Sequence, residues 1–274
     1  MTAAFDWTGR VGQTWAEEWQ RTDRALADLA RHLDAAIEAA APASPIRILD
    51  IGCGAGSTSL AIAKARHDAT VMGVDLSPEL IAVARHRAAG QANVTVHEGD
   101  AIAIARDLAP IDLFISRHGV MFFADPVAAF ADLHRAAAPD ARMLFTCFRD
   151  RADNPWASDL VEQVTGVCPA TPAGYTPGPF GFADPAQTAR ILEAAGWTIE
   201  ECARVDGPYT VGEGEDPVAD AVAFFRRIGP LASILRDAAD PSACTARLKT
   251  ALARYHNGTT VALTASAWLW RIHA

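Results

Sequence analysis

The residues best suited to chemistry follow an apolar run in the first quarter of the chain. The sequence IRILDIGCGAGSTS at positions 46–59 places Gly52, Gly54 and Gly56 between that run and a helix-favouring stretch. Glycine lets a backbone turn tightly and approach a ligand closely, and a helix that begins there offers unpaired N–H groups. The G-x-G-x-G spacing departs from the G-x-G-x-x-G dinucleotide fingerprint. The pattern therefore favours a ligand loop other than a nicotinamide site, with a plain strand-to-helix turn as the alternative.

Two acids follow the next two apolar runs. Asp75 comes nineteen residues after Gly56, in VMGVDLSP, where a carboxylate can accept hydrogen bonds from both hydroxyls of a ribose. Asp100, in VHEGDAIA, suits an acceptor for an adenine amino group. Each acid alone could be a surface turn or helix-start residue. Together with the glycines, at three consecutive strand ends, they predict a nucleoside site.

The elements that must position these residues alternate along the chain. Helices are predicted at 57–66, at 77–89, at 125–138 and from 184 to a terminating Gly196. Three of them begin with Ser or Asp followed by Pro, a capping pattern. Strands separated by helices predict an α/β fold with a doubly wound, mostly parallel sheet, and the last two segments could form an antiparallel edge. The seven predicted strands are 46–51, 70–74, 94–98, 111–116, 143–148, 197–205 and 260–272.

Three regions interrupt this alternation. Residues 1–45 are predicted to form a helical lead-in, and 151–182 and 215–257 are predicted to form cap insertions around a core at 46–150. Open α/β sheets bind ligands at the carboxyl ends of their strands, so we expect the three regions to cover that edge. We expect one domain over 1–274.

Composition excludes several classes of protein. The net charge of −9 and the pI near 5.3 argue against a nucleic-acid partner, which needs a basic face. The apolar runs are too short for the ~20 residues of a membrane-spanning helix. Five scattered cysteines without a CxxC pair indicate reduced thiols, a cytoplasmic location and no structural zinc. The sequence has no cluster of Asp or Asn residues at metal-ligand spacing, so no metal site is predicted.

The motifs together resemble those of the class I S-adenosylmethionine-dependent methyltransferases. LDIGCGAG is similar to their first motif, GVDLSP to the second, EGDA to the third and IDLFISRHGVMFF to the fourth. The stretches SRHGVMFFADPVAAFADLHRA, NPW and PGPFGFADP resemble a bacterial subgroup that methylates small molecules. The resemblance extends over nearly the whole chain. It implies a Rossmann-like fold and S-adenosylmethionine as cofactor, with S-adenosylhomocysteine as product.

The resemblance also implies a role for individual residues. The methionine part of the cofactor would be surrounded by Asp50, Gly52, Cys53, Gly54 and Gly56, with Ser116 and Arg117 beside the reacting centre. The nucleoside would be held by Asp75, Leu76, Asp100 and Ala101. The family pattern has an aromatic residue at position 118, where this chain has His118.

Methyl transfer from a sulfonium is an in-line displacement, so positioning supplies most of the catalysis. An alcohol or phenol acceptor also benefits from a base. His118 is the candidate for that base, and a packed histidine without a chemical role is the alternative. The aromatic residues that could line an acceptor pocket, or simply belong to the core, are Trp15, Trp19, Phe122, Phe148, Trp156, Phe180 and Phe225.

We therefore expect an enzyme that methylates a small, partly apolar molecule, with O-methylation of a hydroxyl or carboxyl group as the first choice. N- or C-methylation stays open. The rival hypotheses are an NAD(P)-dependent oxidoreductase of the same topology and a cofactor-binding protein without catalysis. The sequence does not indicate the oligomeric state.

Overall fold

Seven strands form one sheet in the computed structural model, which describes residues 6–40, 46–169 and 174–274. The strand order is β3-β2-β1-β4-β5-β7-β6. β1 to β5 pair in parallel, and β7 runs antiparallel to β5 and β6. The predicted doubly wound, mostly parallel sheet is therefore confirmed. The strands are β1 Arg47–Ile51, β2 Thr70–Asp75, β3 Val94–Glu98, β4 Ile111–Arg117, β5 Ala137–Phe148, β6 Thr198–Gly212 and β7 Val261–His273.

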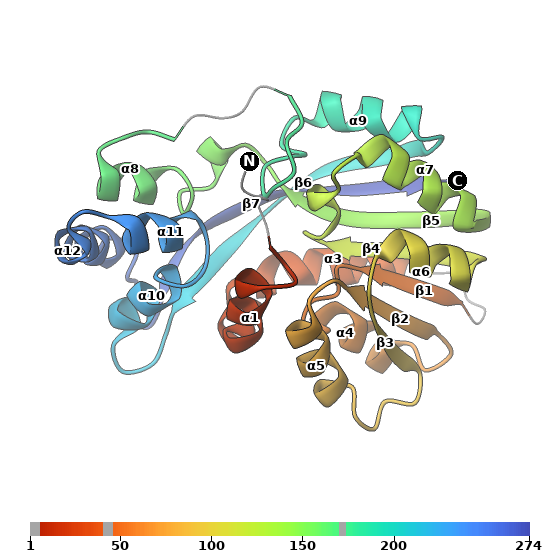
Figure 1. The fold of residues 1–274 in the computed structure, drawn as a ribbon, viewed down its shortest axis with the longest axis horizontal. Coiled ribbons are helices and arrows are strands. Elements are labelled where there is room, and N and C mark those ends of the chain that lie inside the picture. Colours follow the sequence, from red (N-terminus) through yellow and green to blue (C-terminus); the bar gives the residue numbers. More distant parts are fainter. Residues whose placement is uncertain (1–5, 41–45, 170–173) are drawn as a thin grey trace.

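Helices cover both faces of this sheet (Figure 1). α3, α4 and α5 lie on one face, and α6, α7 and α9 pack in a row on the other. This division follows from right-handed crossovers between parallel strands. The helices are α1 Arg10–Glu17, α2 Trp19–Ala25, α3 Ala27–Ala40, α4 Ser57–Ala65, α5 Pro78–Arg87, α6 Ala101–Leu108, α7 Pro126–Ala136, α8 Asp159–Thr165, α9 Pro185–Ala194, α10 Pro217–Phe225, α11 Pro230–Asp237 and α12 Pro241–Ala253, with short 3-10 turns at η1 Val120–Phe122 and η2 Arg151–Asp153.

The predicted helix starts are confirmed by hydrogen bonds. The side chains of Ser77, Asp125 and Asp184 each accept a backbone N–H from the first turn of the helix that follows. Gly196 adopts φ 94° just after α9, which is the left-handed conformation that glycine tolerates at a helix end.

Three features differ from the prediction. β5 begins at Ala137 and not at 143, so the helix predicted at 125–138 ends at Ala136. α6, an eight-residue helix between β3 and β4 that Asp100 caps, was not predicted. β6 and β7 also pair further than expected, from Thr198 opposite His273 to Gly212 opposite Val261. The extension is stabilised because Val205, Tyr209 and Val211 bury their side chains in the core.

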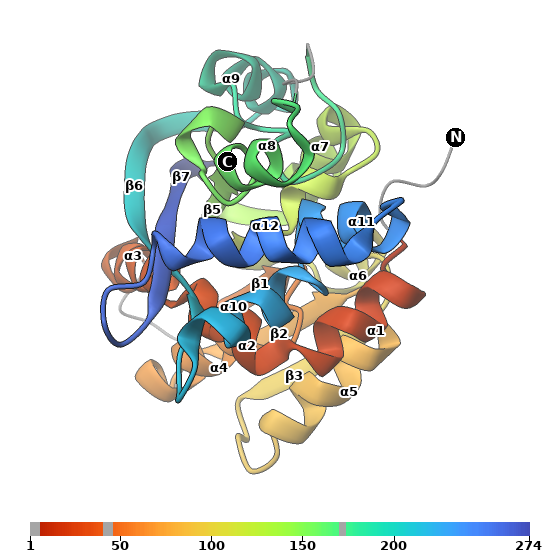
Figure 2. The same ribbon diagram turned by 90° about the vertical axis from the view of Figure 1, so that its left-hand side faces the viewer.

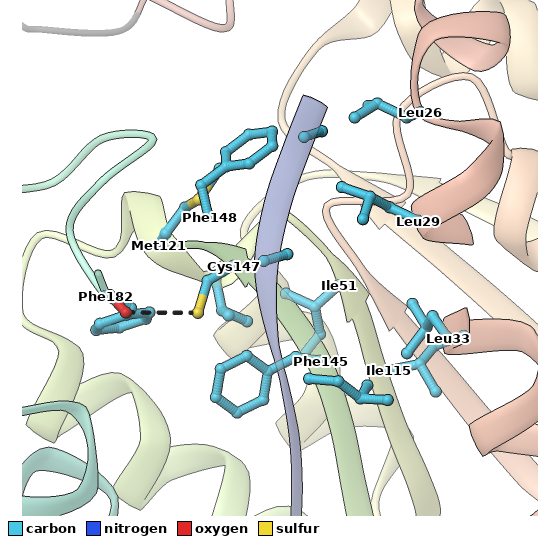
Figure 3. Packing of buried hydrophobic residues seen from close by; sticks show 14 of the residues in the cluster. Leu26, Leu29, Leu33, Ile51, Ile115, Met121, Phe145, Cys147, Phe148 and Phe182 are labelled. Atoms are coloured by element: carbon cyan, nitrogen blue, oxygen red, sulfur yellow. Dashed lines mark hydrogen bonds between the residues drawn. The ribbon is translucent and has the colours of Figure 1, made fainter. Parts of the chain in front are cut away.

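The core lies between the sheet and the helices on both faces. On one side, Leu29 and Leu33 of α3 face the sheet beside Ile115 of β4 (Figure 3). On the other, Phe145 of β5 packs with Phe182, with ring centroids 6.4 Å apart. All five side chains are at most 1% exposed, so the strand ends rest on a rigid layer.

Helices α8, α10, α11 and α12, here called the cap lobe, gather beyond the far ends of β6 and β7 (Figure 1). α12 packs on α8 and on α10 (Figure 2). The lead-in connects the two parts, because α1 packs on α5 while Arg21 and Arg24 of α2 form ion pairs with Asp220 of α10. In the part of the chain that the structure describes, no helix is long and apolar enough to cross a membrane.

Candidate cofactor and acceptor site

The glycine loop, residues 52–56, turns from β1 into α4 with positive φ at each of its glycines, 67° at Gly52, 55° at Gly54 and 81° at Gly56. A side chain at Gly52 would meet Gly119 Cα at 3.0 Å, and one at Gly56 would meet Ala84 Cβ at 3.2 Å. At Gly54 a side chain would meet nothing within 4 Å. The loop is therefore closed at its two ends and open at its centre, where a ligand can reach the backbone.

Asp75, the last residue of β2, lies against this opening. Its Oδ2 accepts the N–H of Gly54 at 2.9 Å, and its Oδ1 accepts the N–H of Ser77 at 2.9 Å. A carboxylate has about four lone-pair sites, so capacity for ribose hydroxyls remains. Burial raises the pKa of Asp75, and the two backbone N–H groups oppose that rise. Leu76 next to it is 46% exposed, which leaves an apolar surface for an adenine ring.

Asp50 and Cys53 support the glycine loop from the interior of the protein. Both side chains are buried, and Asp50 accepts a hydrogen bond from the Ser59 hydroxyl of α4. Burial raises the pKa of Asp50 to about 6, partly offset by the Ser59 hydrogen bond. A side chain at Gly73 of β2 would come within 3.0 Å of Cys53 Sγ, so the loop packs tightly on its neighbouring strand.

Asp100 follows β3 at the same edge of the sheet, since Asp75 pairs with Glu98 across β2 and β3. Its Oδ1 accepts the N–H groups of Ile102 and Ala103 at 3.0 and 2.9 Å. The carboxylate is thus the N-cap of α6, and it is also exposed. Ala101 is the first residue of the helix. Their contact with adenine stays a prediction.

Ser116 joins the ends of β1 and β4. Its buried hydroxyl donates to the carbonyl oxygen of Ile51 at 2.8 Å and accepts the N–H groups of Gly119 and Val120 at 3.1 and 3.2 Å. Gly119 is a residue that the sequence analysis missed: a side chain there would come within 2.6 Å of the Ile51 carbonyl oxygen. The hydroxyl of Ser116 thus joins the turn after β4 to the end of β1, where the glycine loop begins.

Arg117, the last residue of β4, contacts the lead-in. Its Nη2 lies 3.3 Å from a carboxylate oxygen of Asp23 on α2, and Arg87 of α5 lies 2.8 Å from the other. Asp23 therefore attaches α2 to the strand end next to the glycine loop. A contact between Arg117 and a cofactor stays a prediction.

His118 occupies an unusual position directly after β4. Its φ is 61°, its side chain is 8% exposed, and neither ring nitrogen has a hydrogen-bond partner among the described residues. The ring stacks on Phe148 at 4.2 Å between centroids. Burial lowers the pKa of His118 to about 3, and the charge of Arg117 acts in the same direction. The imidazole is therefore neutral at physiological pH, and no titration near ~6.5, the value of a free imidazole, is expected from it.

Three of the predicted pocket aromatics form one cluster, in which Phe148 contacts His118 while Trp156 and Phe180 contact Phe148. Phe148 contacts Trp156 at 5.0 Å between ring centroids, and Trp156 stacks on Phe180 at 5.7 Å. Trp156 is held by a hydrogen bond of 3.0 Å from its Nε1 to Asn154 Oδ1, and Asn154 is itself fully buried. The indole of Trp156 is thus held in one orientation against Phe148, the ring that contacts the imidazole.

The other predicted aromatics lie in separate groups. Trp7, which the sequence analysis missed, connects Trp15 and Phe122 through ring contacts at 5.7 and 5.2 Å. Trp19 lies under the guanidinium of Arg87 at 4.1 Å, on the α5 side of the lead-in. Phe225 is fully buried against Phe224 in the cap lobe, with ring centroids 5.2 Å apart. Their roles in acceptor binding stay predictions.

Comparison with known proteins identifies the family. A family model described as a methyltransferase domain matches residues 43–196, more than half of the chain. The chain belongs to the class I S-adenosylmethionine-dependent methyltransferases. The matched segment of this methyltransferase contains the glycine loop, Asp75, Asp100 and His118. Family membership implies S-adenosylmethionine as the cofactor, and the residues around Gly54 fit it, because they combine an open backbone, a carboxylate with remaining acceptor capacity and an exposed apolar side chain.

Two of the similar proteins have the same name, demethylmenaquinone methyltransferase. The demethylmenaquinone methyltransferase of Thermus thermophilus is 32% identical over 110 residues, which are 40% of this chain and 50% of that protein. That of Deinococcus radiodurans is 25% identical over 165 residues, 56% of this chain and 68% of that protein. This methyltransferase thus spans about half of the first relative and two thirds of the second.

The fold also resembles solved methyltransferase structures. The magnesium protoporphyrin IX methyltransferase of Synechocystis, determined with bound SAH, superposes with a TM-score of 0.54 over 73% of this chain and 90% of that chain. Sequence identity is 18%, so this likeness concerns the fold alone. Among the described residues, no three His, Cys, Asp or Glu side chains lie together as metal ligands would.

Proposed function

We propose that this protein transfers a methyl group from S-adenosylmethionine to a small, partly apolar molecule, with a hydroxyl or carboxyl oxygen as the acceptor atom. The observation that carries the proposal is the open centre of the glycine loop. A side chain added at Gly54 would meet no other atom within 4 Å, and the N–H of Gly54 donates to Asp75. N- and C-methylation of a small molecule remain alternatives.

The chain's own residues would hold the cofactor at three strand ends. Asp75 accepts the ribose hydroxyls, Leu76 covers the adenine, and the backbone at Gly54 borders the methionine part. Asp100 keeps α6 in place at the adenine edge. When bound, S-adenosylmethionine supplies a methyl group that is already activated, so the protein's task is alignment of the acceptor.

His118 would orient the acceptor. A neutral imidazole with an unpaired nitrogen accepts a hydrogen bond from an acceptor hydroxyl and directs an oxygen lone pair toward the methyl group. As the carbon–oxygen bond forms and the carbon–sulfur bond breaks, the hydroxyl proton would pass along this hydrogen bond to the ring nitrogen and from there to water. A carboxylate acceptor needs no proton removal, and there the N–H of the same ring donates instead. Phe148, Trp156 and Phe180 would exclude water and contact the apolar part of the acceptor.

Two further facts support a small apolar acceptor. The relatives named demethylmenaquinone methyltransferase act on one, and the aromatic cluster beside His118 offers apolar surface. The net charge of −9 disfavours a nucleic-acid substrate. The proposal includes a cytoplasmic location.

Calorimetric titration followed by an acceptor screen tests the proposal. We expect S-adenosylmethionine and S-adenosylhomocysteine to bind and NAD(H) not to bind. Methyl-labelled cofactor incubated with a panel of phenols, hydroxyquinones, aromatic carboxylates and amines should then yield a labelled oxygen-methylated product. Binding of NAD(H) without S-adenosylmethionine would favour an oxidoreductase. Cofactor binding with no labelled product from any compound would favour a protein without catalysis.

A further inference from the structure

The hydroxyl of Tyr209 lacks a hydrogen-bond partner in the described part of the chain. Tyr209 lies on β6, and its side chain is only 5% exposed. Burial raises its pKa, so the phenol stays protonated and able to donate. The oxygen itself is not among the fully buried unpaired atoms, so the hydroxyl stays accessible at the edge of a mostly buried ring. A phenol hydroxyl that no protein group pairs is available to a ligand. By contrast, the hydroxyl of Tyr175 donates to the carbonyl oxygen of Phe123 at 2.5 Å.

A continuous series of rings connects this hydroxyl to His118. His118 stacks on Phe148 at 4.2 Å, Phe148 contacts Trp156 at 5.0 Å, and Trp156 contacts Tyr209 at 5.5 Å, all between ring centroids. The four rings come from four separate segments, at the ends of β4 and β5, in the loop before α8 and on β6. They form an apolar wall with an unpaired polar group at each end.

Neighbouring residues hold the rings of Trp156 and Tyr209 in place. Asn154 accepts the indole N–H of Trp156 and also accepts the backbone N–H of Ser266 at 2.9 Å. Phe224 of α10 contacts Tyr209 edge-on at 6.0 Å. The hydroxyl of Tyr209 therefore keeps one place relative to the wall, as a group that recognises a ligand must.

We propose that Tyr209 determines acceptor specificity by donating a hydrogen bond to a second polar group of the acceptor, remote from the methylated atom. The acceptor is then a flat aromatic molecule with a polar substituent at each end, one at His118 and one at Tyr209. This inference rests on the proposed function, because it names the substrate class of the same site.

The test uses two probes that differ only at the remote end. 2-Naphthol and 2,6-dihydroxynaphthalene are titrated calorimetrically into the protein saturated with S-adenosylhomocysteine. We expect the wild-type protein to bind the diol at least tenfold more tightly, because a site built around a hydrogen bond rejects a ligand without it. Tyr209→Phe, which keeps the ring, should bind the two probes within about twofold of each other. 6-Methyl-2-naphthol should bind the wild type as weakly as 2-naphthol, a comparison that needs no variant.

Tyr255→Phe, just after α12, and Tyr175→Phe are the matched controls. Each removes a phenol hydroxyl outside the ring series and should keep the preference for the diol. The affinity for S-adenosylhomocysteine should be unchanged in Tyr209→Phe. A tenfold preference that survives in Tyr209→Phe overturns the inference, as does a wild-type protein that binds neither naphthol. A wild-type protein that does not bind S-adenosylhomocysteine would instead contradict the proposed function itself.

Discussion

The imidazole of His118 lies nearly parallel to the phenyl ring of Phe148, with 4.2 Å between centroids and 13° between the planes. The imidazole thus packs as an aromatic ring would, and it places two ring nitrogens at the end of β4. A non-glycine residue in the left-handed region costs of order 1–3 kcal/mol. The surrounding structure supports that conformation, since the N–H of His118 donates to the carbonyl oxygen of Thr146 at 3.1 Å.

His118→Phe separates the packing role from the chemical role. The phenyl ring keeps the stack and removes both nitrogens. If the imidazole orients the acceptor, turnover should fall by roughly 10²-fold, because a misaligned acceptor loses the in-line geometry. The affinity for S-adenosylhomocysteine, measured by calorimetry, should stay the same. An unchanged turnover would mean that His118 only packs, with positioning alone sufficient for an acceptor that is already ionised.

The depressed pKa of His118 also predicts how stability depends on pH. Its pKa is about 3 in the folded protein, against ~6.5 for a free imidazole. The unfolded chain therefore binds the extra proton first, and folding stability is lost as pH falls below the unfolded value. The loss from this group should reach about 2 kcal/mol at pH ~5.

Urea unfolding at pH 7 and pH 5 measures this effect. The wild type should lose more stability between the two values than His118→Phe does, by about 2 kcal/mol. The pKa of Asp50, raised to about 6, acts in the opposite direction, but it is present in both proteins and cancels in the comparison. Equal losses in the two proteins would show that the imidazole is not shielded from protonation.

Gly54→Val tests the open centre of the glycine loop. The new side chain enters free space in the protein, so we expect a stability loss limited to the strain of φ 55°, of order 1–3 kcal/mol. The affinity for S-adenosylhomocysteine should fall by at least about tenfold, because the side chain takes the place of the ligand.

Gly90→Val is the matched control for that substitution. Gly90 also has a positive φ, 88°, and open space around its side-chain position, but it precedes β3 at the amino edge of the sheet. Its stability loss should be similar and its cofactor affinity normal. Normal binding by folded Gly54→Val protein would contradict the assigned site.

Asp75→Ala should weaken the binding of S-adenosylmethionine and S-adenosylhomocysteine by about tenfold or more. Hydrogen bonds to a charged group are worth about 1.5–3 kcal/mol, and the carboxylate also orders the N–H of Gly54. Asp112→Ala is the control, because that carboxylate likewise accepts a backbone N–H, from Arg47 at 2.7 Å, but at the start of β1 and β4. Equal affinity in Asp75→Ala and the wild type would remove Asp75 from the site.

The sequence by itself determined the features that depend on neighbouring residues. The alternation of apolar runs and capped helices predicted the sheet, and Ser77 and Asp125 mark helix starts through hydrogen bonds within a few residues. The glycine loop and Asp75 were predictable for the same reason, since a strand end followed by glycines is a local pattern. The helix that Asp100 caps was missed, because a binding residue or a surface turn was expected there and the local capping signal was overlooked.

Only the tertiary structure decided which side chains share a site. Trp156 and Tyr209 are more than fifty residues apart, yet their rings lie 5.5 Å from each other, whereas Trp19 and Phe225 pack in other places. His118 differs from an ordinary histidine because segments distant in sequence bury it and leave its nitrogens unpaired. Burial and pairing are sums over contacts between distant segments, so no local pattern encodes them.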